Sequence, residues 1–252
     1  YFDHIIYYTR VFEIIYIMST LEIVIIIVLS VFQSIFGVGL LIIGTPIFLQ
    51  LGYDFYSVLN IILPFSIIVS FLQFITDKSE DSIFKRDFFI ISVPSLMTSL
   101  VILKYFYGDL DIEKVVAFVM IIFSIVNILV LRQYLKLKTN RLLIKLSLVV
   151  LGLLHGLTNL GGSLLTLISS NISKEKIEIR SNISFGYLIF GVIQLSFIVF
   201  FTDSFVLSNP IYFIIPILAF FVSQKLYQVA SSMSFSLTLN TFVLIYGIYI
   251  LI

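Results

Sequence analysis

Eight stretches of about 20 predominantly apolar residues follow one another along this chain of 252 residues, and each is long enough to cross a bilayer as a helix. Hydrophobic residues make up 60% of the chain and charged residues 12%, whereas a soluble domain averages roughly 25% charged residues. A soluble fold needs a polar exterior, so the sequence predicts an all-α, multi-pass membrane protein. The expected spans are 21–44, 55–76, 88–107, 112–134, 142–169, 179–202, 209–227 and 233–252.

Charge and residue content exclude several other functions. The net charge is +1, so we expect no nucleic-acid-binding surface. Cysteine is absent, and the two histidines, His4 and His155, are too few for a histidine-built metal cluster. No Walker motif and no zinc-protease or serine-hydrolase motif occurs in the chain. We therefore expect no cofactor, no metal and no enzyme activity.

Two glycine-rich stretches interrupt the first and the fifth of the expected spans. Residues 33–46 read QSIFGVGLLIIGTP, and residues 155–163 read HGLTNLGGS. A glycine costs roughly 1 kcal/mol in a helix interior and a proline about 3 kcal/mol, so each stretch predicts a break in its helix. Paired breaks at corresponding places in two halves of a membrane protein are typical of a transporter's binding site.

A shift of 122 residues aligns the two stretches and predicts an internal repeat. The aligned pairs are Gln33 with His155, Gly37 with Asn159, Gly39 with Gly161, and Asn60 with Asn182. We expect a first transmembrane repeat over 21–134 and a second over 135–252. Re-entrant glycine stretches would make the repeats inverted, whereas full crossings would make them parallel, and the sequence leaves this open.

The segment 1–20 mixes aromatic and charged residues and is expected to be a tail or an interfacial segment. Position 1 is not Met and Met18 precedes the first apolar run, so residues 1–17 are also open to being upstream sequence. The densest basic cluster, 132–145, is expected in the cytoplasm. With eight full crossings, the N-terminus and the loop with Lys85 would share that side, which would hold nine Lys and Arg residues against six.

Polar residues within and near the glycine stretches are the candidate substrate-binding residues. A broken helix frees backbone N–H groups at the start of its second part, and these suit an anion. His155 lies near the middle of an expected span, where an ionisable residue is a functional candidate that could sense protons or donate to an anion. The alternatives are close helix packing through small residues and a neutral imidazole that bridges helices. The candidates are Gln33, Gly37, Gly39, Asn60, His155, Thr158, Asn159, Gly161, Gly162, Ser163 and Asn182, with Gln73, Arg180 and Gln194 as further polar residues of weaker support.

At residues 36–52 and 156–165 the chain resembles the TauE/SafE (sulfite exporter) family of membrane permeases, and the resemblance extends over roughly 20–252. That family has two repeats, each opening with a helix that runs into a glycine-rich stretch. The resemblance implies transport of small sulfur-containing anions such as sulfite and organosulfonates. Leu40, Leu41, Asn159 and Ser163 stand where the family usually has glycine. These departures make the second stretch the more polar one, so the site is expected to lie towards the second half.

The predicted function is a secondary transporter that moves small anions, such as sulfite, organosulfonates or related sulfur oxyanions, across a bacterial plasma membrane by alternating access. A small anionic substrate and the lipid bilayer are the expected partners. The coupling ion, a proton or Na⁺, stays open, as do the direction of transport and the oligomeric state. The alternatives are a non-transporting membrane assembly or scaffold protein and an intramembrane enzyme.

Overall fold

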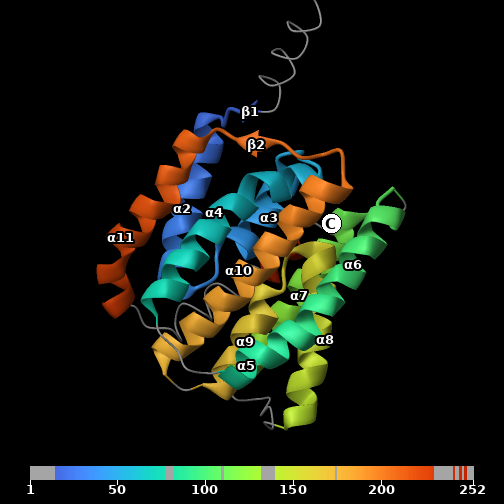
Figure 1. Ribbon diagram of the computed structural model, residues 1–252, viewed down its shortest axis with the longest axis vertical. Helices are drawn as coiled ribbons and strands as arrows, with labels where there is room; N and C mark the ends of the chain where they lie inside the picture. Colours follow the sequence, from blue (N-terminus) through green and yellow to red (C-terminus); the bar gives the residue numbers. More distant parts are fainter. Residues whose placement is uncertain are drawn as a thin grey trace, which may run out of the picture.

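The computed structural model describes residues 15–77, 82–108, 111–131, 140–173 and 175–229, together with 241, 244–245 and 247–248. These residues are almost entirely helical (Figure 1). In chain order the elements are β1 (Ile15–Tyr16), α2 (Thr20–Phe36), α3 (Leu40–Gln50), α4 (Phe55–Thr76), α5 (Ser82–Asp87), the π-helical turn η1 (Phe88–Ser92), α6 (Val93–Phe106), α7 (Ile112–Leu131), α8 (Arg141–Thr158), α9 (Gly162–Ile172), α10 (Lys176–Phe201), β2 (Leu207–Ser208), the 3₁₀ turn η2 (Pro210–Phe213) and α11 (Ile214–Val229).

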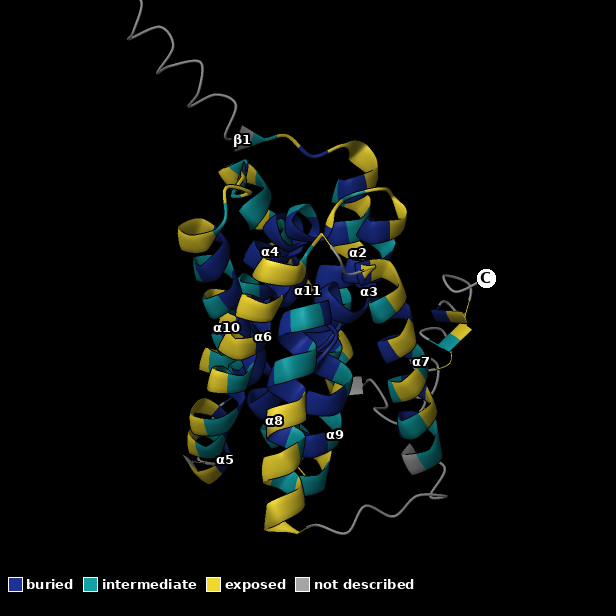
Figure 2. Cartoon of the chain, turned by 90° about the vertical axis from the view of Figure 1, so that its right-hand side faces the viewer, coloured by how far each residue is buried: buried dark blue, intermediate teal, exposed yellow. Residues whose placement is uncertain are grey.

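Six helical segments of the described residues are long and apolar enough to cross a membrane. They are Phe55–Thr76, Ile83–Phe106, Ile112–Leu129, Arg141–Thr158, Lys176–Phe201 and Pro210–Gln228. Their outward faces are rich in exposed side chains, among them Val101, Phe200 and Phe221, while the inward faces are buried (Figure 2). Large apolar side chains on the outside of a helical bundle suit a lipid environment. The chain is therefore an all-α, multi-pass membrane protein, as its composition predicts.

Several helices begin at side chains that accept hydrogen bonds from the first turn. Ser19 and Glu22 form a capping box at the start of α2. Asp54 accepts from the N–H groups of Tyr56 and Ser57 at the start of α4, and Asn140 accepts from Leu142 at the start of α8. These caps define the starts of the helices that the apolar runs alone leave imprecise.

The first expected span, 21–44, is not one helix but the greater part of a helical hairpin. α2 ends at Phe36, and α3 begins at Leu40 and runs back along α2, so that a Cβ on Gly44 would lie 3.2 Å from the Leu29 side chain. At the open end of the hairpin, the Tyr53 hydroxyl, beyond α3, donates to the Glu22 carboxylate near the start of α2. The chain therefore enters and leaves this hairpin at the same end of the molecule.

The fifth expected span, 142–169, is divided into a second hairpin of α8 and α9. α8 runs beside α6 in the same direction, with the Ser92 hydroxyl donating to the Leu148 carbonyl at 2.9 Å and Gly156 packed further along against Ser99. α9 then returns and ends just before α10, where the Asn182 amide donates to the Ser173 hydroxyl at 3.4 Å. The second hairpin enters from the end of the molecule opposite to the first.

Helices α4 and α10 run antiparallel, side by side, through the middle of the bundle (Figure 1). Phe74, late in α4, packs on Phe185, early in α10, with ring centroids 5.9 Å apart. Gly191 packs on Ile67 nearer the middle of both helices. The two hairpins lie against this pair, with α3 beside α4 and α9 beside α10.

The two ends of the bundle carry different polar groups. At the tyrosine end, defined by Tyr16, Tyr53 and Tyr107, the hydroxyls of Tyr16 and Tyr53 donate to Glu22, and burial and this hydrogen bond raise the pKa of Tyr16. At the arginine end, Arg180 forms an ion pair with Asp77. The buried carboxylate at one end is thus held by tyrosine hydroxyls, and the one at the other end by an arginine.

Re-entrant hairpins change the side on which each basic residue lies. Tyr16 lies at the tyrosine end, whereas Lys85 lies at the arginine end over the Phe74 and Phe185 rings. The expectation that the start of the chain shares a side with Lys85 is therefore wrong, because the first hairpin returns the chain to the end at which α2 begins. Lys104 and Lys114 lie at the tyrosine end, and the arginine end holds Lys85, Arg86, Arg141, Lys145, Lys176, Arg180 and Lys225.

Candidate functional site

The backbone breaks in the same way at the tips of both hairpins. Gly37 ends α2 in the left-handed region, with φ of 78°, and Asn159 ends α8 there, with φ of 61°. The Gly37 N–H donates to the Gln33 carbonyl at 2.8 Å, and the Asn159 N–H donates to the His155 carbonyl at 2.7 Å. Glycine adopts this conformation freely, and asparagine tolerates it better than most residues do. Gly37 and Asn159, which a shift of 122 residues aligns in the sequence, therefore have the same role as left-handed caps.

A glutamine from the following long helix braces each tip. Gln73 of α4 donates to the Gln33 carbonyl at 2.7 Å, and Gln194 of α10 donates to the His155 carbonyl at 3.4 Å. Each glutamine thus reaches the same carbonyl that accepts from the left-handed cap. The sequence suggests both glutamines only as weak candidates, and the structure gives them equivalent places.

The second glycine of each break permits a close approach of the chain to itself. A Cβ on Gly39 would lie 2.9 Å from the Gln33 backbone nitrogen, and a Cβ on Gly161 would lie 2.8 Å from the His155 Cβ. Contacts that short do not occur between real Cβ atoms and their neighbours, so only glycine fits without a shift. Gly39 and Gly161 are therefore required for the turn into α3 and α9.

Gln33, at the first tip, has all its side-chain hydrogen-bonding groups paired within the first half. Its Nε2 donates to the Ser66 carbonyl at 3.1 Å, the Ser66 hydroxyl at 3.0 Å and the Ser70 hydroxyl at 3.0 Å. Its Oε1 accepts from the Ser66 hydroxyl at 3.2 Å. Gln33 thus fastens α2 to α4 and has no group left for a ligand.

His155 occupies the equivalent position at the second tip and is buried. The Gly161 N–H donates to its Nδ1 at 3.2 Å, so Nδ1 is an acceptor and the neutral ring carries its proton on Nε2. The ring stacks on Phe190 with centroids 4.7 Å apart and lies 5.9 Å from the Tyr187 ring. No hydrogen-bond partner lies within normal distance of Nε2 among the described residues, and the Gln194 side chain lies close to the ring. His155 therefore offers one buried N–H donor to the interior of the bundle.

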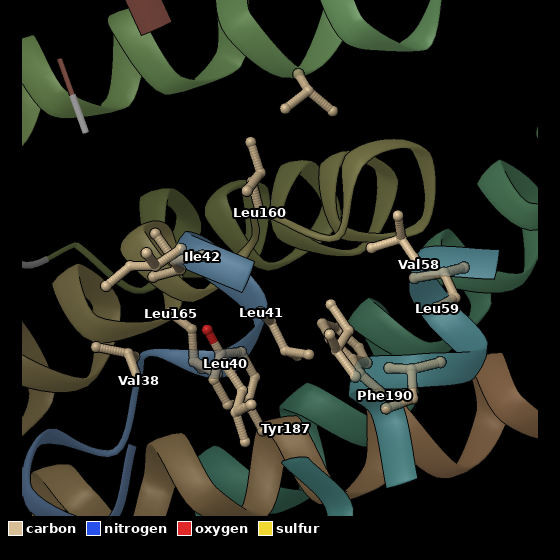
Figure 3. Packing of buried hydrophobic residues seen from close by; sticks show 14 of the residues in the cluster. Val38, Leu40, Leu41, Ile42, Val58, Leu59, Leu160, Leu165, Tyr187 and Phe190 are labelled. Atoms are coloured by element: carbon tan, nitrogen blue, oxygen red, sulfur yellow. The ribbon is translucent and has the colours of Figure 1, made fainter. Parts of the chain in front are cut away.

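Tyr187 offers a second donor beside the second tip. Its side chain is fully buried, and its hydroxyl has no partner within the described part of the chain. A Cβ on Gly162 would come within 1.6 Å of that hydroxyl and 2.9 Å of Ile42, so Tyr187 points at the place where α9 meets α3. Figure 3 shows Tyr187 and Phe190 reaching from α10 towards Leu40 and Leu41. A buried hydroxyl without a partner costs free energy, which a ligand that accepts its hydrogen bond would recover.

Asn159 joins the two hairpins. Its Nδ2 donates to the Thr45 hydroxyl of α3 at 2.9 Å. Its Oδ1, like the Oε1 of Gln194, is buried without a partner in the described ranges. The second tip thus combines two unpaired donors, on His155 and Tyr187, with two unpaired acceptors.

The remaining predicted residues fall into two groups. Thr158 lies in the second tip, where its hydroxyl donates to Leu154 at 2.7 Å and accepts from Leu160 at 3.2 Å, and half-buried Ser163 opens α9. Asn60 and Asn182 do not join the site, because the antiparallel α4 and α10 carry them to opposite ends. The Asn60 amide donates to the Ser204 carbonyl at the tyrosine end, and Asn182 lies near the arginine end.

The structure adds Thr45, Tyr187 and Phe190 to the site. Thr45 lies within the first glycine-rich stretch, so its place before Pro46 was a usable signal. Tyr187 and Phe190 lie in an apolar run of a chain that is 16% aromatic, so no sequence signal separates them from lipid-facing rings. Only the packing of α10 on the second hairpin identifies them.

No group of three or more His, Cys, Asp or Glu side chains that could hold a metal ion occurs among the described residues. Comparison with protein-family models, with curated proteins and with solved structures gave no match. The resemblance to the TauE/SafE family therefore stays a prediction.

Proposed function

We propose that the protein is a secondary carrier that moves a small anion across the membrane by alternating access. The observation that carries the proposal is a pair of buried donors, His155 Nε2–H and the Tyr187 hydroxyl, that have no hydrogen-bond partner among the described residues and lie at the tip of the second hairpin. Neutral donors in a buried site suit an acceptor-rich, weakly hydrated anion, whereas a metal cation prefers carboxylate ligands. Among the sulfur oxyanions that the family resemblance implies, small sulfonates and singly protonated sulfite meet this requirement, because they carry one charge and several acceptor oxygens.

We further infer that the two halves are inverted repeats. The left-handed caps at Gly37 and Asn159 are 122 residues apart, and their hairpins enter from opposite ends of the bundle. Discontinuous helices that meet between inverted repeats are a common architecture for substrate sites in secondary transporters. The eighth apolar run, 233–252, would complete the second half, and most of it lies outside the described residues.

The distribution of basic residues supports an orientation. Lys104 and Lys114 are at the tyrosine end, and the other lysines and arginines of the described residues are at the arginine end. Short cytoplasmic loops are enriched in lysine and arginine, so we place the arginine end in the cytoplasm. Among the described residues the division is seven to two, whereas eight full crossings would divide the same nine residues four to five.

The burial of both tips supports a carrier over an assembly or scaffold protein. Gly37, Val38 and Gly39 are buried, as are Asn159, Leu160 and Gly161, so neither tip faces lipid. A scaffold would direct its polar groups towards other subunits, whereas these face the interior of the chain.

The test replaces His155 with each of two amides and measures uptake of radiolabelled sulfite and methanesulfonate into proteoliposomes. In His155→Gln the amide nitrogen reaches the position of Nε2 and keeps the donor, whereas in His155→Asn the amide oxygen keeps the Nδ1-like acceptor for Gly161. Donation to substrate predicts that His155→Asn loses roughly 10- to 100-fold in uptake and His155→Gln loses less, because a hydrogen bond to a charged group is worth about 1.5–3 kcal/mol.

Tyr187→Phe removes only the second donor and is expected to lower uptake by a similar roughly 10-fold factor. Tyr56→Phe is the matched control, because its buried hydroxyl also has no partner among the described residues but lies at the start of α4. Wild-type uptake by both His155→Asn and Tyr187→Phe, in protein that folds normally, would contradict the proposed site.

A further inference from the structure

Arg180 and Asp77 form the one ion pair that is buried among the described residues. The side chains of Arg180 and Asp77 are 4% and 6% exposed, whereas the pairs Arg86–Asp87 and Lys114–Asp111 each include a largely exposed member. Replacing a buried ion pair by apolar residues is often neutral or stabilising, so stability alone explains such a pair poorly. The burial of this arginine is therefore better explained by a further role in binding.

The Arg180 guanidinium binds the Asp77 carboxylate in a bidentate manner. Nε donates to Asp77 Oδ2, and one terminal nitrogen donates to Asp77 Oδ1 at 2.7 Å. Sulfonate, sulfite and phosphate present the same pair of oxygens to a guanidinium as a carboxylate does. The Asp77 carboxylate thus occupies the position that an oxyanion would take on Arg180.

The arginine is held in place by groups other than Asp77. Its second terminal nitrogen donates to the Ser34 carbonyl at 2.9 Å, and its guanidinium carbon lies 3.4 Å from the Tyr227 ring centroid. The ammonium of Lys176 lies 4.3 Å from the same ring centroid, so a second cation lies nearby. The guanidinium would therefore stay oriented if the carboxylate were exchanged for another anion.

The pair also lies next to the first hairpin tip. A Cβ on Gly37 would lie 3.4 Å from Arg180 Cγ. Arg180 belongs to α10, Asp77 follows α4 and Ser34 belongs to α2, so one side chain joins both halves at the arginine end. An anion that displaced Asp77 would release a link between the halves.

We propose that Arg180 is an oxyanion-binding site at the arginine end and that Asp77 is its built-in competitor. A small oxyanion from solution, of the sulfonate or sulfite class, exchanges with the Asp77 carboxylate on the guanidinium and so opens the link between α4 and α10. This inference rests on the proposed anion transport and adds to it a second binding step, beside the first hairpin tip and not the second.

The test measures binding of radiolabelled sulfite and methanesulfonate to the whole protein in phosphatidylcholine nanodiscs. Asp77→Asn removes the competing charge and keeps the shape, and is expected to tighten binding at least tenfold. Arg180→Lys keeps the positive charge but loses the bidentate pair of N–H donors, and is expected to weaken binding tenfold or more. Arg86→Gln, which removes an exposed charge at the same end, is the control and is expected to bind as the wild type does.

Opposite outcomes overturn the inference. A structural ion pair predicts that Asp77→Asn lowers thermal stability with no gain in binding, and that the neutral pair Asp77→Asn/Arg180→Gln restores stability and transport together. If Asp77→Asn fails to fold, wild-type binding by Arg180→Lys overturns the proposal by itself. Binding that rises only when phosphatidylglycerol is added to the nanodisc would assign the site to lipid headgroups and not to a soluble anion.

A His155→Asn background separates the two proposals. The gain in binding from Asp77→Asn is expected to persist in that background while transport is lost. Loss of transport without any gain from Asp77→Asn would leave the His155 site standing and reject the Arg180 site. A gain from Asp77→Asn with wild-type transport by His155→Asn would reject the His155 site alone.

Discussion

The hairpin of α2 and α3 attaches its tip to the bundle with a fully paired glutamine, whereas the equivalent histidine of the α8 and α9 hairpin has a donor without a partner in the described part of the chain. The second hairpin also packs through glycines, since Gly152 and Gly156 bring α8 against α6, while Gln194 and Asn159 hold its tip by hydrogen bonds. The same backbone design thus serves as an anchor in one half and as a candidate site in the other. The side chain that is fully hydrogen-bonded at the first tip therefore corresponds to one with an available donor at the second.

The largest difference is expected at the glycines that hold α8. A Cβ on Gly152 would lie 2.3 Å from the Ser92 carbonyl oxygen and 2.7 Å from Ser95 Cβ, so alanine forces α8 away from α6. Gly152→Ala is expected to cost about 3 kcal/mol or more, at the upper end of overpacking effects. Gly44→Ala, in the first hairpin, meets the flexible end of Leu29 at 3.2 Å and Ile62 at an ordinary 3.6 Å, and is expected to change stability by less than about 1 kcal/mol.

Thermal unfolding in detergent measures both glycine variants. Equal destabilisation by Gly44→Ala and Gly152→Ala would mean that the two hairpins are packed alike, and the contrast between them would be lost.

A smaller difference is expected at the paired positions of the tips. Gln33→Leu removes the hydrogen bonds to Ser66 and Ser70, and is expected to cost about 2–3 kcal/mol because each bond contributes about 0.5–1.5 kcal/mol. His155→Asn keeps an acceptor for the Gly161 N–H and is expected to cost less than about 1 kcal/mol. The fraction of protein that elutes as a folded monodisperse peak, followed against temperature, measures both costs. Greater instability in the His155 variant would reverse the roles assigned to the hairpins.

The smallest effect is expected from making the caps alike. Asn159→Gly relieves the cost of a left-handed asparagine but removes the bond to Thr45, so the net change in stability is expected to stay within about 1 kcal/mol. Gly37→Asn instead places a new Cβ 3.2 Å from Ile183 Cγ2 and is expected to destabilise the protein by about 1–2 kcal/mol. A large stability loss in Asn159→Gly, by the same unfolding measurement, would show that the Thr45 bond is a principal support of the second hairpin.

Apolar length and local breakers predicted much of the helical fold. The expected span 55–76 matches α4, and both glycine stretches contain the predicted breaks. The direction of α3 and α9 after each break could not be predicted, because a left-handed cap fixes only the local turn and the return path depends on packing against α4 and α10. For this reason the predicted assignment of loops to the two sides of the membrane was partly wrong.

The site was predicted best where the polar residues are close in sequence. His155, Asn159 and Gly161 belong to one turn, so they had to meet. Asn60 and Asn182 were paired by their equivalent places in the repeat, but an inverted arrangement carries equivalent residues to opposite ends. Equivalence under such a repeat therefore predicts similar local structure and not shared contact.

The pairing of the first strand has a consequence for biosynthesis. Ile15 and Tyr16 pair with Leu207 and Ser208, and α2 lies along α11 (Figure 1). The hairpin of α2 and α3 therefore lacks this partner until β2 and α11 have been synthesised. Because contacts between distant segments form late, we expect the first hairpin to reach its final depth only after α11 has entered the membrane. A translocon or chaperone that shields α2 during that interval would determine the yield of folded protein.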